Sequence, residues 1–166
     1  AGVTEAVFCG GIRKPRLFDV RPDWLGLKII SRLRSFGDDT ALRAIAAALE
    51  GEGVRIVSPL SLVPELLARQ GPIGKRRLTG EQRADALTGL SAARALGAAD
   101  IGQTVVVKRG VILAVEAVEG TDACIARGGA LGAGAVVVKE RKPQQDDRCD
   151  VPAIGPRTIE ACAAAG

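Results

Sequence analysis

Apolar and polar positions alternate along the chain in a pattern that predicts an α/β fold. Short apolar runs next to glycines, at residues 5–9, 54–59 and 135–139, are typical of buried strands. Between the first two runs, residues 25–36 and 41–50 carry apolar side chains at the spacing of amphipathic helices. Because strands and helices alternate in this way, we predict part of a doubly wound α/β domain on the N-terminal side of the chain.

A short basic segment with two glycines and a proline separates this part from the rest. Residues 61–69 predict one more short helix, and residues 70–78, with the sequence QGPIGKRRL, predict a linker. We therefore place a boundary near Gly71 and predict two domains, one over residues 1–71 and one over residues 72–166.

The second domain opens with the clearest helix of the sequence, at residues 79–96. Thr79 and Gln82 stand three residues apart at its start, as the two members of a capping box do. Gly97 predicts its end, since glycine is common just after the last helical turn.

A hairpin and further elements follow. Residues 104–108 and 111–117 predict two strands, because they are apolar and rich in valine and are separated by a two-residue turn, Arg109-Gly110. A helix is expected to begin at Thr121, and the chain ends in a polar loop followed by another helix.

The composition limits the classes of function. Hydrophobic residues make up 47% of the chain and aromatic residues 2%, with one Trp and no Tyr. So few aromatic rings argue against a base-stacking surface, and we expect no nucleic-acid partner. The net charge of +4 could suit a phosphate-rich ligand or an anionic membrane surface, but an ordinary solvated surface is the favoured interpretation.

Histidine and cysteine usage narrows the chemistry further. The chain has no His, which excludes Ser-His and Cys-His catalysis within it. Its four Cys form no CxxC pair, which argues against a zinc site. Scattered Cys and the absence of a signal peptide or an apolar run of membrane-spanning length indicate a cytoplasmic protein.

Acidic side chains gather in two places. The stretch VEAVEGTD holds Glu116, Glu119 and Asp122 between a predicted strand and the predicted helix. Carboxylates at a strand end can hold Mg²⁺, which would neutralise charge on a diphosphate and position a water. Two plainer interpretations stay open: Asp122 as an acid favoured by the helix dipole, and Glu116 as a solvent-facing strand residue.

The second acidic group lies in the C-terminal loop beside basic residues. This loop carries Asp146, Asp147, Arg148 and Asp150. Arginine can grip phosphate in bidentate fashion, so acids and bases around one loop favour a site for phosphate and metal over a simple basic patch. The preceding basic residues of this region are Lys139, Arg141 and Lys142.

Four segments resemble one known family. Residues 100–125 (DIGQTVVVKRGVILAVEAVEGTDACI) and 139–159 (KERKPQQDDRCDVPAIGPRTI) are similar to two long signatures of the LpxI family of UDP-2,3-diacylglucosamine pyrophosphatases. Residues 8–15 (FCGGIRKP) and 26–43 (GLKIISRLRSFGDDTALR) resemble the family in the same order. The similarity covers essentially the whole chain.

The resemblance implies a fold and an activity. It implies the end of a Rossmann-like N-terminal domain followed by most of a second α/β domain, with substrate held between them. Because both ends of the chain fall inside predicted elements, we expect a fragment truncated at each end. The implied reaction is Mg²⁺-dependent hydrolysis of UDP-2,3-diacylglucosamine to UMP and 2,3-diacylglucosamine 1-phosphate (lipid X), a step of lipid A biosynthesis. Such an enzyme would work in the cytoplasm, at the inner-membrane surface. Whether it forms a homodimer stays an open question.

The resemblance also assigns roles to single residues. Asp150 matches the Asp of the family's RxDxPxxG segment, and we expect it to bind metal or orient the attacking water. The expected catalytic residues are Asp150, Asp122 and Glu119, and the expected metal ligands are Asp150, Asp122 and Asp147. The expected substrate-binding residues are Gln103, Arg148, Lys142, Gly10, Gly11 and Thr121. The alternative is a non-catalytic module that binds a nucleotide or phosphosugar, which would lack convergent carboxylates.

Overall fold

The computed structural model describes residues 2–9, 23, 24, 26 and 38–166, and these fall into two compact units. The first unit comprises Ala1–Arg69 and Gln145–Val151, and the second comprises Gln70–Gln144 and Pro152–Gly166. The chain therefore passes from one unit to the other three times. Of the predicted helix at residues 25–36 the structure describes residue 26 alone, and the glycine pair Gly10-Gly11 lies outside the described residues.

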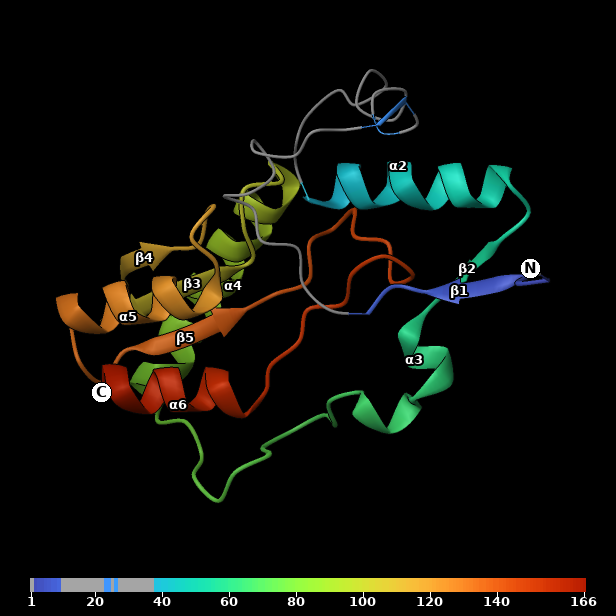
Figure 1. Cartoon of the computed structure of the whole chain (residues 1–166). Helices are drawn as coiled ribbons and strands as arrows, with labels where there is room; N and C mark the ends of the chain where they lie inside the picture. The colour runs from blue at the N-terminus through green and yellow to red at the C-terminus, as the bar shows by residue number, and fades with distance from the viewer. Residues whose placement is uncertain (1, 10–22, 25, 27–37) are drawn as a thin grey trace. The chain divides into compact units, whose positions relative to one another are not determined.

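The first unit contains a parallel pair of strands joined through a helix (Figure 1). Strand β1 (Glu5–Val7) pairs with β2 (Arg55–Val57), and helix α2 (Asp38–Gly51) precedes β2. Parallel strands need a long crossover connection, so this pairing is consistent with the predicted α/β arrangement. Ala46, Ile56 and Cys149 form its buried core.

The helix predicted at residues 61–69 is wrong in its bounds. The structure has a single turn of helix, α3 (Pro59–Leu62), followed by a 3₁₀ turn, η2 (Pro64–Leu66). Pro64 has no N–H for a helical hydrogen bond, and proline disfavours helical backbone in the residue before it. Val63 accordingly leaves the helical region with φ −136°. Residues 67–79 contain neither helix nor strand, as expected for the predicted linker.

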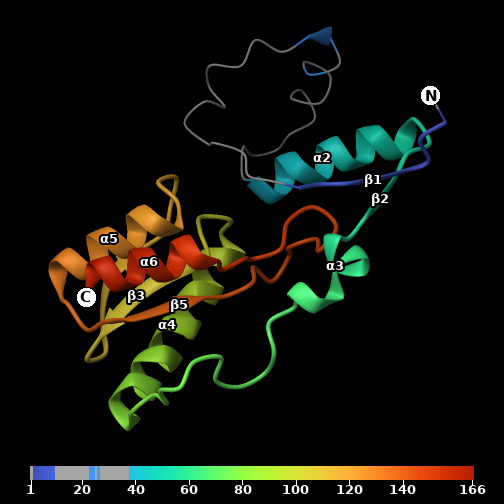
Figure 2. The same cartoon turned by 60° about the horizontal axis from the view of Figure 1, so that its bottom comes forward.

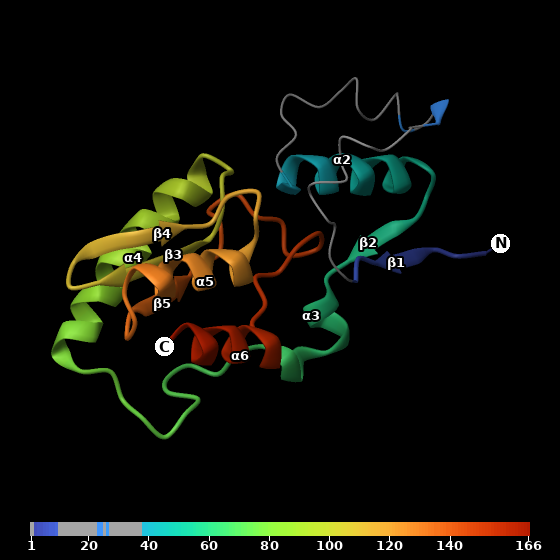
Figure 3. The same cartoon turned by 60° about the vertical axis from the view of Figure 1, so that its left-hand side comes forward.

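The second unit is a three-stranded antiparallel sheet covered by helices on both faces (Figure 1, Figure 3). The strand order is β4-β3-β5, and the predicted hairpin of β3 and β4 is confirmed. The predicted helices and strands of this region are all present, although β4 ends two residues earlier and α4 runs one residue past Gly97. Their bounds are α4 Gly80–Ala98, β3 Thr104–Lys108, β4 Val111–Val115, α5 Thr121–Leu131, β5 Val136–Lys139 and α6 Pro156–Ala165.

The alternation of side chains along β3 explains this layering. Val105 and Val107 pack with Ala93 of α4, whereas Val106 packs with Cys124 of α5 on the opposite face. Helix α6 then lies against α5 (Figure 2). A mixed α/β fold is thus confirmed. Among the described residues, no helix is long and apolar enough to cross a membrane.

Glycines allow the helices to approach the sheet and one another closely. A Cβ atom on Gly128 of α5 would lie 2.6 Å from Val106, and one on Gly89 of α4 would lie 2.5 Å from Val138. A Cβ on Gly129 would meet Ala165 of α6 at 2.5 Å. These distances are shorter than real contacts, so any side chain at these positions would push the layers apart.

Candidate functional site

A polar cluster lies at one edge of the sheet in the second unit. Thr104 begins β3 and is paired with Lys139, the last residue of β5. Glu116 follows the end of β4, and its N–H donates to the Thr104 carbonyl at 2.8 Å. Because β3 runs antiparallel to both neighbours, its start lies beside their ends, which brings these three residues together. Thr121, the first residue of α5, completes the cluster.

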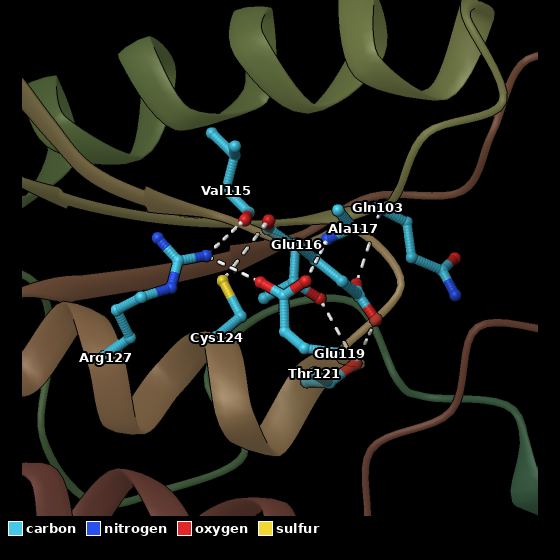
Figure 4. Close-up of polar contacts among 9 residues, drawn as sticks. Gln103, Val115, Glu116, Ala117, Glu119, Thr121, Cys124 and Arg127 are labelled. Atoms are coloured by element: carbon cyan, nitrogen blue, oxygen red, sulfur yellow. Dashed lines mark hydrogen bonds and ion pairs between the residues drawn. The ribbon is translucent and has the colours of Figure 1, made fainter. Parts of the chain in front are cut away.

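The Thr121 hydroxyl is the centre of this cluster. It donates to Glu116 Oε1 at 3.1 Å, accepts from Lys139 Nζ at 3.2 Å, and lies 3.3 Å from Thr104 Oγ1. Figure 4 shows the Glu116 and Thr121 side chains pointing toward one another. The Thr121 hydroxyl therefore already donates its proton to Glu116 within the cluster. The donor that Thr121 can offer to an anion is its backbone N–H at the start of α5.

Glu116 is buried, with 6% of its surface exposed. Its other oxygen, Oε2, accepts from the Gln103 backbone N–H at 3.4 Å. The interpretation of Glu116 as a solvent-facing strand residue is therefore wrong: it lies just after β4, with both oxygens hydrogen-bonded as buried charges require. Gly102 explains the close fit, because a Cβ there would lie 2.1 Å from the Glu116 carbonyl oxygen.

Glu119, predicted to be catalytic, is held in an ion pair. Arg127 Nη2 donates to Glu119 Oε1 at 2.6 Å and to the Val115 carbonyl at 2.8 Å, and the Ala117 N–H donates to Glu119 Oε2 (Figure 4). A hydrogen bond from its own backbone N–H and the Arg127 guanidinium hold the pKa of Glu119 below its ordinary value. Glu119 is thus kept ionised, and it ties the loop after β4 to α5.

Asp122 lies in the first turn of α5 and is exposed. The helix dipole favours a carboxylate at this position, which is the plainer of the two interpretations of Asp122 given above. Because the side chain is exposed, it is also accessible to a ligand. Within the part of the chain that the structure describes, no three acidic or cysteine side chains form a group able to hold a metal.

Lys142, predicted to bind substrate, is buried in an ion pair with Asp100. Its Nζ lies 2.6 Å from Asp100 Oδ1, and its side chain is 5% exposed. Asp100 Oδ2 and Gln103 Oε1 are both buried without a hydrogen-bond partner among the described residues. The Gln103 side chain points away from Glu116 (Figure 4). Asp100 was not predicted to be a site residue, because it lies 42 positions from Lys142 and no local sequence motif indicates this ion pair.

The acidic loop belongs to the first unit. Arg148 donates to Asp146 Oδ2 and to Glu50 Oε1, each at 2.7 Å. The hydrogen bond from Arg148 lowers the pKa of Asp146, and Asp146 in turn raises the pKa of Arg148. Asp150 Oδ2 accepts from Gln145 Nε2 at 2.5 Å. Asp147 is half-buried in the same segment.

The expected site residues therefore divide between the two units. The second unit holds Gln103, Glu119, Thr121, Asp122 and Lys142, and the first unit holds Asp147, Arg148 and Asp150. Sequence reasoning missed Thr104, Asp100 and Gln145 as neighbours of these groups. Strand register could have signalled Thr104, since it begins β3 opposite the end of β5.

Comparison with known proteins matches two family domains in succession along the chain. The family model of the LpxI N-terminal domain matches residues 1–66, and that of the LpxI C-terminal domain matches residues 69–166. The chain belongs to the LpxI family. It is 37% identical over 177 aligned positions to the UDP-2,3-diacylglucosamine pyrophosphatase LpxI of Caulobacter vibrioides. That alignment covers 99% of this chain and 63% of the relative, so the chain spans less than two thirds of its length.

The two LpxI domain matches meet close to the linker. The matched ranges end at residue 66 and begin again at residue 69, and the first structural unit ends at Arg69 before it resumes at Gln145. The segment Gln145–Val151 therefore belongs to the LpxI C-terminal domain in sequence and to the first compact unit in space. This segment contains Asp150.

Proposed function

We propose that this protein hydrolyses the pyrophosphate bond of UDP-2,3-diacylglucosamine, giving UMP and 2,3-diacylglucosamine 1-phosphate. The observation that carries the proposal is the match of both LpxI domains along the chain, together with 37% identity to a pyrophosphatase of that name. Consistent with the diacyl substrate, the proposed place of action is the cytoplasmic face of the inner membrane.

The polar cluster of the second unit suits a phosphate-bearing ligand. The first N–H groups of α5 have no helical acceptor, and they gather at the sheet edge beside Lys139. The ammonium group of Lys139 has three N–H donors. Two of them donate to Thr121 Oγ1 and to the Ala153 carbonyl oxygen, at 3.2 and 2.9 Å. We propose that this edge contacts the diphosphate, with Gln103 beside it.

The donor chemistry of the expected ligands suits Mg²⁺. The ion takes oxygen ligands and is commonly held by one or two carboxylates plus substrate phosphates and water, so a group of three protein ligands is not required. We propose that one or two of the expected ligands, Asp150, Asp122 and Asp147, provide these carboxylates. When bound, Mg²⁺ would neutralise charge on the diphosphate and lower the pKa of a bound water. We propose that Asp150 either is one of these ligands or orients the attacking water and accepts its proton.

Hydrolysis of labelled substrate tests the proposal. The full-length protein is incubated with UDP-2,3-diacylglucosamine carrying ³²P in the phosphate next to uridine, with Mg²⁺ or with EDTA. We expect labelled UMP with Mg²⁺ only. Asp150→Ala should lower kcat by about 10²-fold, the scale of a positioned acid or base, while substrate binding is retained.

Three outcomes would contradict parts of this assignment. Binding of the substrate without release of UMP by the wild-type protein would favour the alternative, a non-catalytic nucleotide- or phosphosugar-binding module. Equal rates with EDTA and with Mg²⁺ would remove the metal from the mechanism. If Asp150→Ala lowers thermal stability but leaves kcat unchanged, Asp150 has a structural role only.

A further inference from the structure

The segment that carries Asp150 is anchored on the first unit. Cys149 is 6% exposed and packs in a core with Ala46 of α2 and Ile56 of β2. Arg148 forms an ion pair with Glu50 near the end of α2, with Nη1 and Oε1 separated by 2.7 Å. The residues on either side of the segment belong to the second unit. These contacts determine where the segment lies, but they leave the direction of the Asp150 carboxylate open.

A tight turn determines the backbone position of Asp150. The N–H groups of Cys149 and Asp150 both donate to the Asp146 carbonyl, at 2.9 and 3.1 Å. The Arg148 N–H donates to Asp146 Oδ1 at 3.0 Å, so the Asp146 side chain also stabilises the turn. The backbone of Asp150 is therefore held, and only its side-chain torsions remain to be set.

The Gln145 side chain contacts the Asp150 carboxylate. It is 3% exposed, and its Nε2 donates to Asp150 Oδ2 at 2.5 Å. A buried amide is costly without partners, so this contact is retained in the folded state. The bond uses one carboxylate oxygen and leaves Oδ1 outside it. We propose that Gln145 is the positioning residue for Asp150: it turns Oδ1 toward the reacting groups. This inference rests on the proposed function of Asp150.

The neighbouring glutamine provides a matched control. Gln144 and Gln145 are identical side chains at adjacent positions, but Gln144 Nε2 donates to the Gly97 carbonyl of α4 at 2.7 Å. That bond attaches the loop to the second unit and does not involve Asp150. Replacing either glutamine by methionine keeps the side-chain length and removes the amide. The two variants therefore differ in whether Asp150 loses its partner.

The experiment compares Gln145→Met with Gln144→Met in the full-length protein. We expect Gln145→Met to lower kcat for UDP-2,3-diacylglucosamine by about tenfold, because small misplacements of a reacting group cost up to about 10²-fold. KM should change less than twofold. Gln144→Met should leave kcat within twofold. In an Asp150→Ala background, Gln145→Met should cause no further loss. A similar loss of kcat in both glutamine variants, or a full additional loss without Asp150, would overturn the inference.

A structural measurement separates this inference from the proposed function. If the wild-type protein releases no UMP, the proposed function fails, and crystal structures of the wild type and Gln145→Met then decide the positioning role. We expect the Asp150 carboxylate to change rotamer in the variant while the Asp146 turn is retained. An unchanged rotamer would refute the positioning role whatever the activity. Gln145→Asn, which keeps the amide on a shorter side chain, should recover part of kcat if Gln145→Met is poorly folded.

Discussion

Asp85→Ala should destabilise the protein through the hairpin turn between β3 and β4. Asp85 lies on α4 and is 5% exposed. Its Oδ2 accepts from the Arg109 N–H at 2.9 Å and its Oδ1 from the Gly110 N–H at 2.6 Å. Both turn residues have positive φ, 50° and 76°, which is the backbone of a tight two-residue hairpin. One carboxylate thus joins the helix to the turn.

The size of the effect follows from these two bonds. A hydrogen bond to a charged group contributes about 1.5–3 kcal/mol, and the exposed turn lets water replace part of each lost bond. We therefore expect Asp85→Ala to lower the free energy of unfolding by about 2–3 kcal/mol. Asp85→Asn, which keeps one acceptor oxygen, should cost about half as much.

Glu81 provides the matched control, one helical turn before Asp85. Glu81 Oε1 lies 3.3 Å from Arg109 Nε, and the two side chains are 62% and 79% exposed. Exposed ion pairs contribute at most about 1 kcal/mol, so Glu81→Ala should have little effect. Urea unfolding of the second unit, followed by circular dichroism, measures both variants. Equal losses for Glu81→Ala and Asp85→Ala would refute the argument that burial of the carboxylate matters.

Three further predictions concern stability and reactivity. Gly128→Ala should cost about 1–3 kcal/mol of unfolding free energy, measured in urea, since its Cβ would lie 2.6 Å from Val106. Because Arg148 lowers the pKa of Asp146 in the folded state, the stabilisation is present above about pH 4 and is lost as pH falls through the lowered value. Asp146→Asn should therefore flatten the acid side of the stability profile. Burial raises the pKa of Cys124 to about 11, so iodoacetamide at pH 8 should modify it only after unfolding, as followed by mass spectrometry.

Elements specified by neighbouring residues were predicted from the sequence. The capping box is one case: Thr79 Oγ1 accepts from the Gln82 N–H, and Gln82 Oε1 accepts from the Thr79 N–H. The hairpin at Arg109-Gly110 is another. In both, the hydrogen bonds join residues at most a few positions apart, so the pattern of residue types carries the information. The family was also recognisable, because its signatures are long continuous stretches.

The tertiary structure decided which groups became neighbours. Glu116 and Thr121 lie beside Thr104 and Lys139 only because the register of two strand pairs places those strand ends together. The segment of Asp150 joins the first unit through Cys149 and Arg148, whose partners are about 100 positions away. Contacts over such separations depend on how whole helices and sheets pack, and no local pattern of residues encodes them.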